Sequence, residues 1–482
     1  MLLPAGLPTF RPLFMRRTKI IVTLGPATDS PEMIGRLMDA GVNVVRLNMS
    51  HAPHDWVRRV TADIRSAAQA RGRYVAIMMD TQGPAIRTGD LPAALDLQPG
   101  QKFTLTVRGA KSEEVQSVDV NYENFVNDIS VGDIVLVDNG TIHMKVLNKQ
   151  ANKIECEVLT PGKLGSRRHI NLPGVKVSLP ALTAKDLADI AVALELELDY
   201  LALSFVREAK DLLQLRAVLQ RSPRPPHVIA KIEDQQAIQN LDSIVTEADA
   251  IMIARGDLGI ECPYEELPII QRRIAKTCQQ IGRPFIVATH MLESMIQNPL
   301  PTRAEVTDVA NAVFEQADAI MLSGETTVGQ YPLRCVEVLD RIAVRLECSG
   351  GAGFQDAADL TTPRQKLVKS AVAMANDLKA DAIVVQTLGG RIARHTSWMR
   401  PRYSPIHAFC QEERVARALA LCWGVKPSTI PFDETQPDAT LGLALASLKA
   451  QGVLRRGSTV VVIGAIASGN QIVDAVQMRT LE

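Results

Sequence analysis

Cysteine is sparse in this chain, and its spacing indicates no pairing. The seven cysteines are scattered through 482 residues without a Cys-x-x-Cys pair, which excludes a disulfide framework and a zinc knuckle. Aromatic residues make up only 4% of the chain and charged residues 22%, against 46% hydrophobic residues. This composition is that of a globular protein and not of a disordered one, and a reducing cytoplasmic location fits it best.

The chain also lacks an excess of charge of either sign. Lys plus Arg and Asp plus Glu each number 53, so no basic excess would attract nucleic acid or an anionic membrane. No apolar run reaches the roughly 18 residues that span a bilayer. We therefore expect no nucleic-acid partner and no membrane partner, and any anion must be bound by a local cluster of residues.

The length suggests about three domains, on a prior of roughly 150 residues per domain. The first stretch, residues 1–15, contains Pro4, Pro8 and Pro12, which interrupt any helix. No small-residue cleavage site follows a charged stretch there. We expect residues 1–15 to be a disordered extension.

Short apolar runs then alternate with amphipathic stretches of helical period. Eight such runs lie at residues 19–25, 43–48, 74–80, 200–206, 227–233, 250–257, 284–290 and 319–325. Runs that are apolar along their whole length are typical of parallel strands covered by helices, so eight of them predict a (β/α)8 TIM barrel. Polar residues close these runs, at the rim where barrel enzymes build their sites; they are Arg46, Asn48, Asp80, Ser204, Lys231, Glu233, Asp257, Thr289 and Glu325.

The spacing of the runs breaks once, between the third and the fourth. The intervening chain is far longer than an ordinary connection, and it holds short β-type runs at 102–107, 134–137, 143–147 and 153–159 between turn residues. We predict that a small antiparallel β domain, residues 89–171, is inserted there as a lid. The barrel would then comprise residues 16–88 and 172–346.

A third domain is expected after the barrel. Residues 347–363 are rich in Gly, Asp and Thr and are typical of a linker. Helical and strand patterns alternate from 364 to 482, which predicts a three-layer α/β sandwich.

The strongest chemical signal is the sequence Lys231-Ile232-Glu233 at the end of one strand. Alternation along the strand points Lys231 and Glu233 to the same side, into the barrel mouth. Asp257, which we place at the end of the next strand, can join Glu233 as a second oxygen ligand of a hard divalent ion such as Mg²⁺. Gly256 would let a substrate approach the backbone. A purely structural alternative is an ion-pair ring that closes the barrel.

A second polar group follows the second strand. Arg46 suits a phosphate because its guanidinium cannot lose its charge. Asn48 and Ser50, with Asp80 and Thr81 from the third strand, offer oxygen atoms for a weakly held monovalent ion. Helix capping by Asn48 and Ser50 is the structural alternative.

A histidine pair and several missing motifs bear on the chemistry. His51 and His54 have the spacing of a metal pair, but His54 lies outside the expected rim. The chain has no Gly-x-x-x-x-Gly-Lys-Ser/Thr, Gly-x-Gly-x-x-Gly, Gly-x-Ser-x-Gly or His-Glu-x-x-His sequence. The chain therefore lacks the signatures of P-loop NTPases, dinucleotide oxidoreductases, serine hydrolases and zincins.

Taken in order along the chain, these motifs resemble the pyruvate kinase family. The matching segments are residues 17–20, 23–27, 43–51, 80–84, 231–233, 254–259, 289, 291–295, 301–305 and 323–326. They cover nearly the whole chain and include the lid insertion. The resemblance implies transfer of the phosphoryl group of phosphoenolpyruvate to ADP, which gives pyruvate and ATP in glycolysis.

The resemblance also implies roles for individual residues. Glu233 and Asp257 would hold Mg²⁺ or Mn²⁺, and Lys231 would stabilise the transition state. Arg46 would hold the phosphoryl group. Substrate contacts are implied for Gly256, Asp257 and Thr289, monovalent-cation contacts for Asn48, Ser50, Asp80 and Thr81, and contacts to nucleotide phosphates for Asn48, Met49, Ser50, His51, Arg87 and Arg168.

Two positions bear on regulation. Ala85 stands where the family usually has Glu, associated with K⁺ dependence, or Lys, associated with independence, so K⁺ remains an expected cofactor. The turn at residues 387–391 could cradle an effector phosphate or could be an ordinary strand-to-helix turn. The resemblance further implies an allosteric homotetramer.

Two rival functions remain open on the sequence. One is a metal-dependent aldolase or lyase that acts on pyruvate, with Lys231 as the Schiff-base amine. Glu233 beside Lys231 argues against this reaction, because a neighbouring anion keeps an amine protonated. The other rival is a non-catalytic regulatory protein of the same fold, against which the intact set of candidate catalytic residues speaks.

Overall fold

A computed structural model describes residues 16–107, 116–433, 435–468 and 471–482. The expected extension at residues 1–15 lies outside the described residues. None of the described helices is long and apolar enough to cross a membrane. Contacts divide the chain into two compact units. The first comprises residues 1–45, 62–76 and 291–482, and the second comprises residues 46–61 and 77–290.

Eight parallel strands form a closed barrel in the order β1-β16-β15-β14-β13-β12-β3-β2, which confirms the predicted TIM barrel. Almost every residue of these strands is buried, as expected for strands covered by helices. Their bounds are β1 Lys19–Thr23, β2 Val44–Asn48, β3 Ala76–Asp80, β12 Tyr200–Leu203, β13 His227–Ile232, β14 Ala250–Ala254, β15 Phe285–Ala288 and β16 Ala319–Leu322.

The strands end earlier than the apolar runs suggested. β14 ends at Ala254, and the next residues form helix α8, Arg255–Glu261. Asp257 therefore lies in the first turn of a helix and not at the end of a strand, so that expectation was wrong. Glu325 likewise belongs to the short helix α11, Gly324–Thr327. Its buried carboxylate accepts backbone hydrogen bonds from Leu292 at 2.9 Å and Ser323 at 2.7 Å, so it stabilises the rim.

Helices follow the barrel strands in both units, and side chains fix where several of them begin. Thr183 and Thr302 each form a capping box, with Asp186 and Glu305 as partners. The first unit contains α1 Pro31–Asp39, η1 Glu293–Ile296, α10 Arg303–Phe314, α11 and α12 Pro332–Glu347, the second contains α4 Ala184–Glu195, α5 Ala209–Leu219, α6 Gln235–Gln239, α7 Leu241–Glu247, α8 and α9 Leu267–Ile281, and α2 His54–Ala70 contributes to both.

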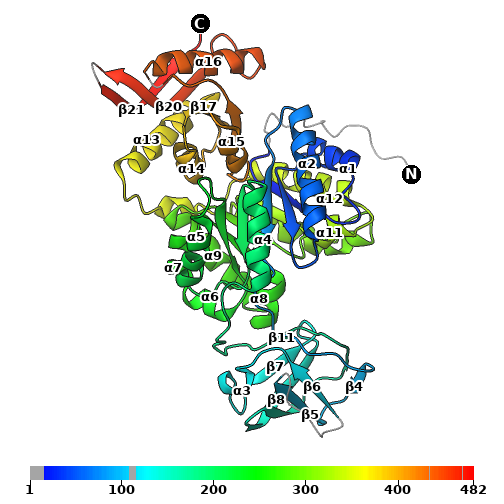
Figure 1. The fold of residues 1–482 in the computed structure, drawn as a ribbon. Helices are drawn as coiled ribbons and strands as arrows, with labels where there is room; N and C mark the ends of the chain where they lie inside the picture. Colours follow the sequence, from blue (N-terminus) through cyan, green and yellow to red (C-terminus); the bar gives the residue numbers. More distant parts are fainter. Residues whose placement is uncertain (1–15, 108–115, 434, 469–470) are drawn as a thin grey trace. The chain divides into compact units, whose positions relative to one another are not determined.

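The insertion between β3 and β12 is a β domain, as predicted (Figure 1). Its six-stranded sheet has the order β11-β7-β8-β9-β5-β6, and β4 pairs with β10 separately. The pair β5 and β6 is parallel, which the antiparallel prediction missed. The elements are β4 Leu95–Leu97, β5 Lys102–Val107, β6 Ser117–Val120, α3 Phe125–Asp128, β7 Ile134–Val137, β8 Ile142–Gln150, β9 Lys153–Val158, β10 Gly162–Leu164 and β11 Ile170–Asn171.

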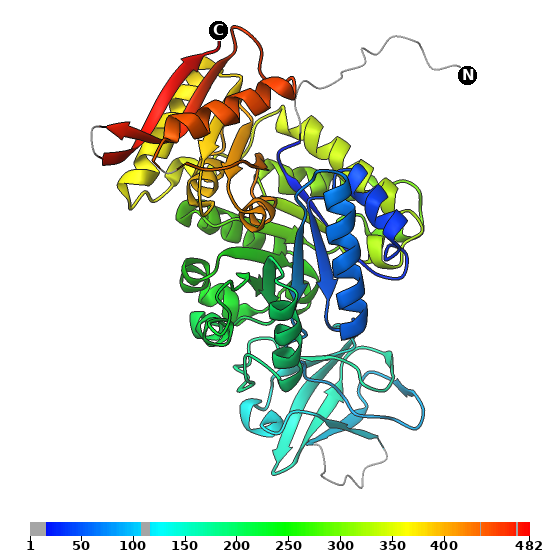
Figure 2. The ribbon, with the colours of Figure 1, turned by 45° about the horizontal axis from the view of Figure 1, so that its top comes forward.

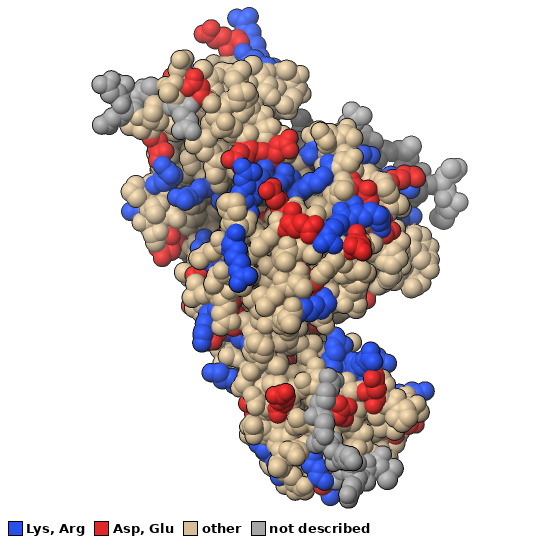
Figure 3. Space-filling model, viewed as in Figure 1, with Lys and Arg blue, Asp and Glu red and all other residues tan. Residues whose placement is uncertain are grey.

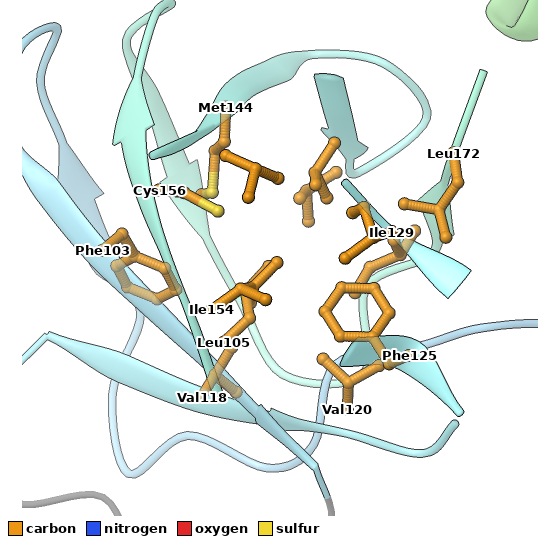
Figure 4. Packing of buried hydrophobic residues seen from close by; sticks show 14 of the residues in the cluster. Phe103, Leu105, Val118, Val120, Phe125, Ile129, Met144, Ile154, Cys156 and Leu172 are labelled. Atoms are coloured by element: carbon orange, nitrogen blue, oxygen red, sulfur yellow. The ribbon is translucent and has the colours of Figure 1, made fainter. Parts of the chain in front are cut away.

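The lid sheet curls around an apolar core of its own. Figure 4 shows Phe103 and Leu105 from β5, Ile154 and Cys156 from β9, and Phe125 from α3 converging on this core. Two isolated antiparallel bridges lie at its edges, from Arg87 to His169 and from Thr88 to Val120. Residues 87 and 88 thus connect the sheet edge near β11 to the edge at β6. The sheet is therefore nearly closed into a small barrel.

The C-terminal domain is the predicted three-layer sandwich. Its single mixed sheet has the order β19-β18-β17-β20-β21, and only the pair β20 and β21 is antiparallel. One apolar core lies between this sheet and α13, α14 and α15, and a second lies between the sheet and α16 (Figures 1 and 2). The 3-10 turn η2, Phe354–Ala357, lies in the expected linker. The other bounds are α13 Pro363–Leu378, β17 Ala382–Gln386, α14 Arg391–Trp398, β18 Ile406–Cys410, α15 Glu413–Leu419, β19 Val425–Thr429, α16 Pro437–Ala450, β20 Thr459–Ser468 and β21 Gln471–Thr480.

Charges of both signs are mixed on one face of the protein. On the face that Figure 3 shows, Lys and Arg are interspersed with Asp and Glu. This distribution agrees with the equal numbers of acidic and basic residues in the sequence.

Candidate active site

A polar cavity of about 360 Å³ lies in the second unit. The ends of β2, β3 and β13, the segments that follow them and β12, and the first turn of α8 line it, together with parts of the lid. It brings together most of the residues that the sequence singled out, namely Arg46, Asn48, Ser50, Asp80, Arg87, Arg168, Lys231, Glu233 and Asp257, and Ala85 also lines it.

Lys231 of β13 is held by oxygen atoms on three sides. Its Nζ lies 2.8 Å from Glu233 Oε1 and 3.6 Å from Asp80 Oδ2, and it donates to Ser204 Oγ at 2.8 Å. Burial by itself lowers the pKa of the ammonium, but the two carboxylates outweigh burial and the pKa of Lys231 is raised. The side chain is therefore a fixed positive charge in a buried position.

Arg46 lies beside the same carboxylate that faces Lys231. Its Nε donates to Asp80 Oδ2 at 3.1 Å, and its Nη2 also contacts that oxygen. The other oxygen, Asp80 Oδ1, is buried and has no hydrogen-bond partner among the described residues. A buried carboxylate oxygen without a partner is costly, so Asp80 fits the expected contact with a monovalent cation.

Glu233 follows β13 directly and is almost completely buried. Its Oε2 accepts a hydrogen bond of 2.6 Å from the backbone of Phe205. Burial, together with the like charge of Asp257, raises the pKa of Glu233, while Lys231 opposes this effect. A buried carboxylate that faces the negative charge of a second carboxylate suits a bound cation.

A divalent ion at this place would rely on these two carboxylates. Among the described residues, no group of three or more His, Cys, Asp or Glu side chains could hold a metal. Glu233 and Asp257 are hard oxygen ligands, and they would leave the remaining positions to water and substrate, which is the pattern that Mg²⁺ favours. The residues present thus fit the ion.

The loop after β2 supplies Asn48 and Ser50 to the cavity. Asn48 Oδ1 accepts a hydrogen bond of 3.1 Å from the backbone of Ser50. Met49 between them is buried, and its carbonyl accepts from Lys185 Nζ at 2.7 Å, whereas His51 is exposed.

His54 lies away from the cavity lining. Its Nε2 is 2.7 Å from Asp189 Oδ1, so this ring nitrogen is engaged by a carboxylate that does not line the cavity.

Thr81 contacts the site indirectly, through hydrogen bonds with Ser204. Its Oγ1 accepts from the backbone of Ser204 at 3.0 Å, and its carbonyl accepts from Ser204 Oγ at 2.7 Å. Ser204 in turn accepts the hydrogen bond from Lys231. The sequence placed Ser204 at the rim but did not predict that it binds the Lys231 ammonium, because that contact needs the register between β12 and β13.

Thr289 and Gly256 meet each other rather than line the cavity. The backbone N–H of Gly256 donates to Thr289 Oγ1 at 3.2 Å. Thr289 has a φ of +69°, which is costly for a β-branched residue. Arg255 stabilises this conformation by donating to the carbonyls of Ala288 at 3.2 Å and Thr289 at 2.7 Å.

The lid contributes charged groups and four residues that the sequence did not single out, namely Asp138, Asn139, Arg167 and His169. Arg168 Nη1 lies 3.3 Å from Asp138 Oδ1, and Arg87 Nη1 donates to the carbonyl of Arg167 at 3.3 Å. His169 also lines the cavity. Burial, followed by the charge of Arg87, lowers the pKa of His169 to about 4, so its imidazole is neutral at neutral pH.

Comparisons with known proteins agree over most of the chain. The family model described as the pyruvate kinase barrel domain matches residues 15–336, and that of the pyruvate kinase alpha/beta domain matches residues 365–476. Plastidial pyruvate kinase 2 of Arabidopsis thaliana is 42% identical over 94% of this chain and 78% of that relative. Pyruvate kinase of Geobacillus stearothermophilus is 40% identical, with the same coverage.

A solved structure shows the same agreement in three dimensions. The crystal structure of a pyruvate kinase from Cryptosporidium parvum superposes with a TM-score of 0.91 at 34% sequence identity. The match covers 97% of this chain and 96% of that one. Since sequence and structure agree over both domains, the chain belongs to the pyruvate kinase family.

Proposed function

We propose that this chain transfers the phosphoryl group of phosphoenolpyruvate to ADP and so forms pyruvate and ATP. The observation that carries the proposal is the buried Lys231 ammonium, which Glu233, Asp80 and Ser204 fix in a polar cavity beside Arg46. In phosphoryl transfer, charge spreads over the phosphoryl and enolate oxygens, and a fixed cation stabilises that charge more than it stabilises the substrate.

The other residues would bind and orient the reactants. Arg46 would hold the phosphoryl group through its charged fork. Thr289 would lie near the face of the enolate that receives a proton, and the backbone at Gly256 and Asp257 would contact the substrate. Arg87, Arg168 and the loop from Asn48 through Met49 and Ser50 to His51 would contact the nucleotide phosphates.

Two cations complete the proposal. Glu233 and Asp257 would hold Mg²⁺ or Mn²⁺, which when bound supplies positive charge to the carboxylate and phosphoryl oxygens of the substrate. Asn48, Ser50, Asp80 and Thr81 would hold K⁺. This assignment is supported by Asp80 Oδ1, which is buried and accepts no hydrogen bond within the part of the chain that the structure describes.

The rival aldolase reaction needs a neutral amine at Lys231. The 2.8 Å contact with Glu233 and the raised pKa of Lys231 favour the ammonium instead, and an ammonium is a poor nucleophile.

The decisive experiment measures pyruvate formation by the purified protein with phosphoenolpyruvate, ADP and either Mg²⁺ or Mn²⁺. We expect turnover that requires both ADP and the divalent ion. The absence of turnover with both ions would refute the proposal. In that event, borohydride trapping of Lys231 with pyruvate separates the aldolase from a protein without catalytic activity.

Assembly and location are also part of the proposal. A homotetramer is expected from the family resemblance and is testable by light scattering of the purified chain. A cytoplasmic location agrees with the scattered free cysteines, although one of the relatives is named plastidial.

A further inference from the structure

Helix α8 carries Asp257 in its first turn and ends at Glu261. Two other segments of the second unit bind this last residue. Asn171 Nδ2 donates to Glu261 Oε1 at 2.8 Å, and Gln235 Nε2 donates to the carbonyl of Glu261. Glu261 is therefore a junction between three segments.

Each of the two partner segments carries part of the candidate active site. Asn171 belongs to lid strand β11 and lies three residues after Arg168, which lines the cavity. Gln235 lies two residues after Glu233. Through Glu261, the helix that carries Asp257 is thus bonded to the lid and to the segment that carries Glu233.

The bond between Asn171 and Glu261 lies in a buried and acidic setting. Asn171 is only 4% exposed, and its Oδ1 has no partner among the described residues. Burial, with the negative charges of Asp234 and Asp257, raises the pKa of Glu261 to about 7, and the hydrogen bond from Asn171 opposes this effect. The Asn171 amide therefore stabilises the carboxylate against its acidic neighbours.

We propose that Glu261 is a positioning residue whose hydrogen bond with Asn171 sets the lid strand β11, and with it Arg168, relative to the helix that holds Asp257. The inference rests on the proposed function, because Arg168 and Asp257 are the proposed nucleotide and metal contacts. It implies that breaking the bond weakens nucleotide binding while leaving the Lys231 chemistry in place.

The test uses Glu261→Ala, Asn171→Ala and the double variant of the full chain. We expect the KM for ADP to rise roughly 3- to 30-fold in each single variant, with a smaller change in kcat. The KM for ADP of the double variant should be no higher than that of the single variants, because each single substitution already removes the same hydrogen bond. If Glu261→Ala does not fold, Asn171→Ala decides the outcome, and a wild-type KM for ADP in that variant overturns the inference.

Two further variants separate positioning from a general loss of stability. Glu261→Gln keeps an oxygen that accepts from Asn171, so it should restore a KM close to that of wild type. Tyr74→Phe removes a hydrogen bond of 2.7 Å with Thr429 Oγ1 in the first unit and should leave the KM for ADP unchanged.

A second readout does not depend on turnover. Mn²⁺ should slow hydrogen exchange in residues 169–178 of wild type, and it should do so much less in Asn171→Ala. The inference is overturned if both single variants keep the wild-type KM and the Mn²⁺-induced protection, or if Glu261→Gln is as impaired as Glu261→Ala. A wild-type protein that shows this protection but no kinase activity would refute the proposed function alone.

Discussion

Lys231 illustrates what strand geometry predicts at the scale of single residues. The period of two along a strand places Lys231 and Glu233 on one side, and the structure brings their charged atoms to 2.8 Å. The contacts of Lys231 with Asp80 and Ser204 could not be predicted in this way, because they join three separate strands and depend on the barrel register. Local alternation is visible in a sequence, whereas the neighbours across strands are not.

We expect Lys231→Met to lower kcat by on the order of 10³, because the ammonium acts mainly in the transition state. Metal binding should not weaken, since the substitution removes a cation that competes for Glu233. Single-turnover kinetics and a Mn²⁺ titration measure the two effects. A variant that changes mainly KM would contradict the assigned role.

Asp257→Asn should raise the Mg²⁺ concentration for half-maximal activity by about tenfold, because an amide oxygen is a weaker ligand for a hard cation. Asp242→Asn is a matched control, since Asp242 is an exposed carboxylate on α7 of the same unit. An Asp257→Asn titration that coincides with wild type would remove Asp257 from the ligand set.

Potassium should activate the wild-type enzyme. Among the described residues Asp80 Oδ1 is buried without a hydrogen-bond partner, and Ala85 lines the same cavity without supplying a charge. An external cation would therefore stabilise the developing phosphoryl charge. Rates in K⁺ and in a tetraalkylammonium salt at equal ionic strength test this for wild type and for Ala85→Lys. Activation by K⁺ should disappear in Ala85→Lys. Equal rates for wild type in both salts would disprove the prediction that K⁺ activates the protein.

At the scale of elements, the barrel strands were predictable because they are apolar along their whole length, and their ends were not. Asp257 lies in the first turn of α8, because this helix begins at Arg255, directly after β14. In the last domain, strand β19 spans Val425–Thr429. Gly424, with a φ of +69°, turns the chain just before it, and Pro427 is tolerated because β19 is an edge strand.

Strand β21 was missed altogether. It pairs antiparallel with β20 from Ser468↔Gln471 to Thr459↔Thr480. Ile472 and Met478 on this strand are more than half exposed, so its sequence lacks the buried alternation that identifies a strand. Pairing with β20 defines it, and such pairing is not visible in local pattern.

Strand β18 makes the stability of the last domain dependent on pH. His407 is buried, its Nε2 has no partner among the described residues, and burial with the charge of Lys426 lowers its pKa to about 3. Between about pH 6.5 and 3 the unfolded chain binds this proton and the folded chain does not, so stability falls as the pH falls.

His407→Leu should therefore lose less thermal stability than wild type between pH 7 and pH 4. Calorimetry at both pH values measures the difference. Equal losses in the two proteins would show that His407 is protonated in the folded domain.

At the scale of the whole molecule, the break in strand spacing predicted the lid, because an insertion of this length needs a core of its own. The lid has that core. The exact domain boundaries at 16–88, 89–171, 172–346, 347–363 and 364–482 stay predictions. The contacts that join the last domain to the barrel residues of the first unit could not be foreseen, because they involve residues far apart in sequence.

One such contact is the buried pair Arg400–Asp318, with Nη2 and Oδ2 2.7 Å apart and both side chains only 2% exposed. Asp318→Asn should cost about 3–5 kcal/mol, because it removes the buried negative charge that faces the Arg400 guanidinium. Asp90→Asn, which breaks the exposed pair with Arg167, should change the stability little. Thermal unfolding that is equally affected in both variants would contradict this ranking.

The lid bridge between Arg87 and His169 has a consequence for the order of folding. Strands β3 and β12 are neighbours, with Tyr200 opposite Met78, although the lid separates them in sequence. Closing so long a loop costs chain entropy before the pair can form. The bridge holds the entry and exit of the lid side by side. If the lid folds first, only a short loop remains to be closed before β3 and β12 can pair. We therefore expect the lid to be an early folding unit that lowers the kinetic barrier to barrel closure.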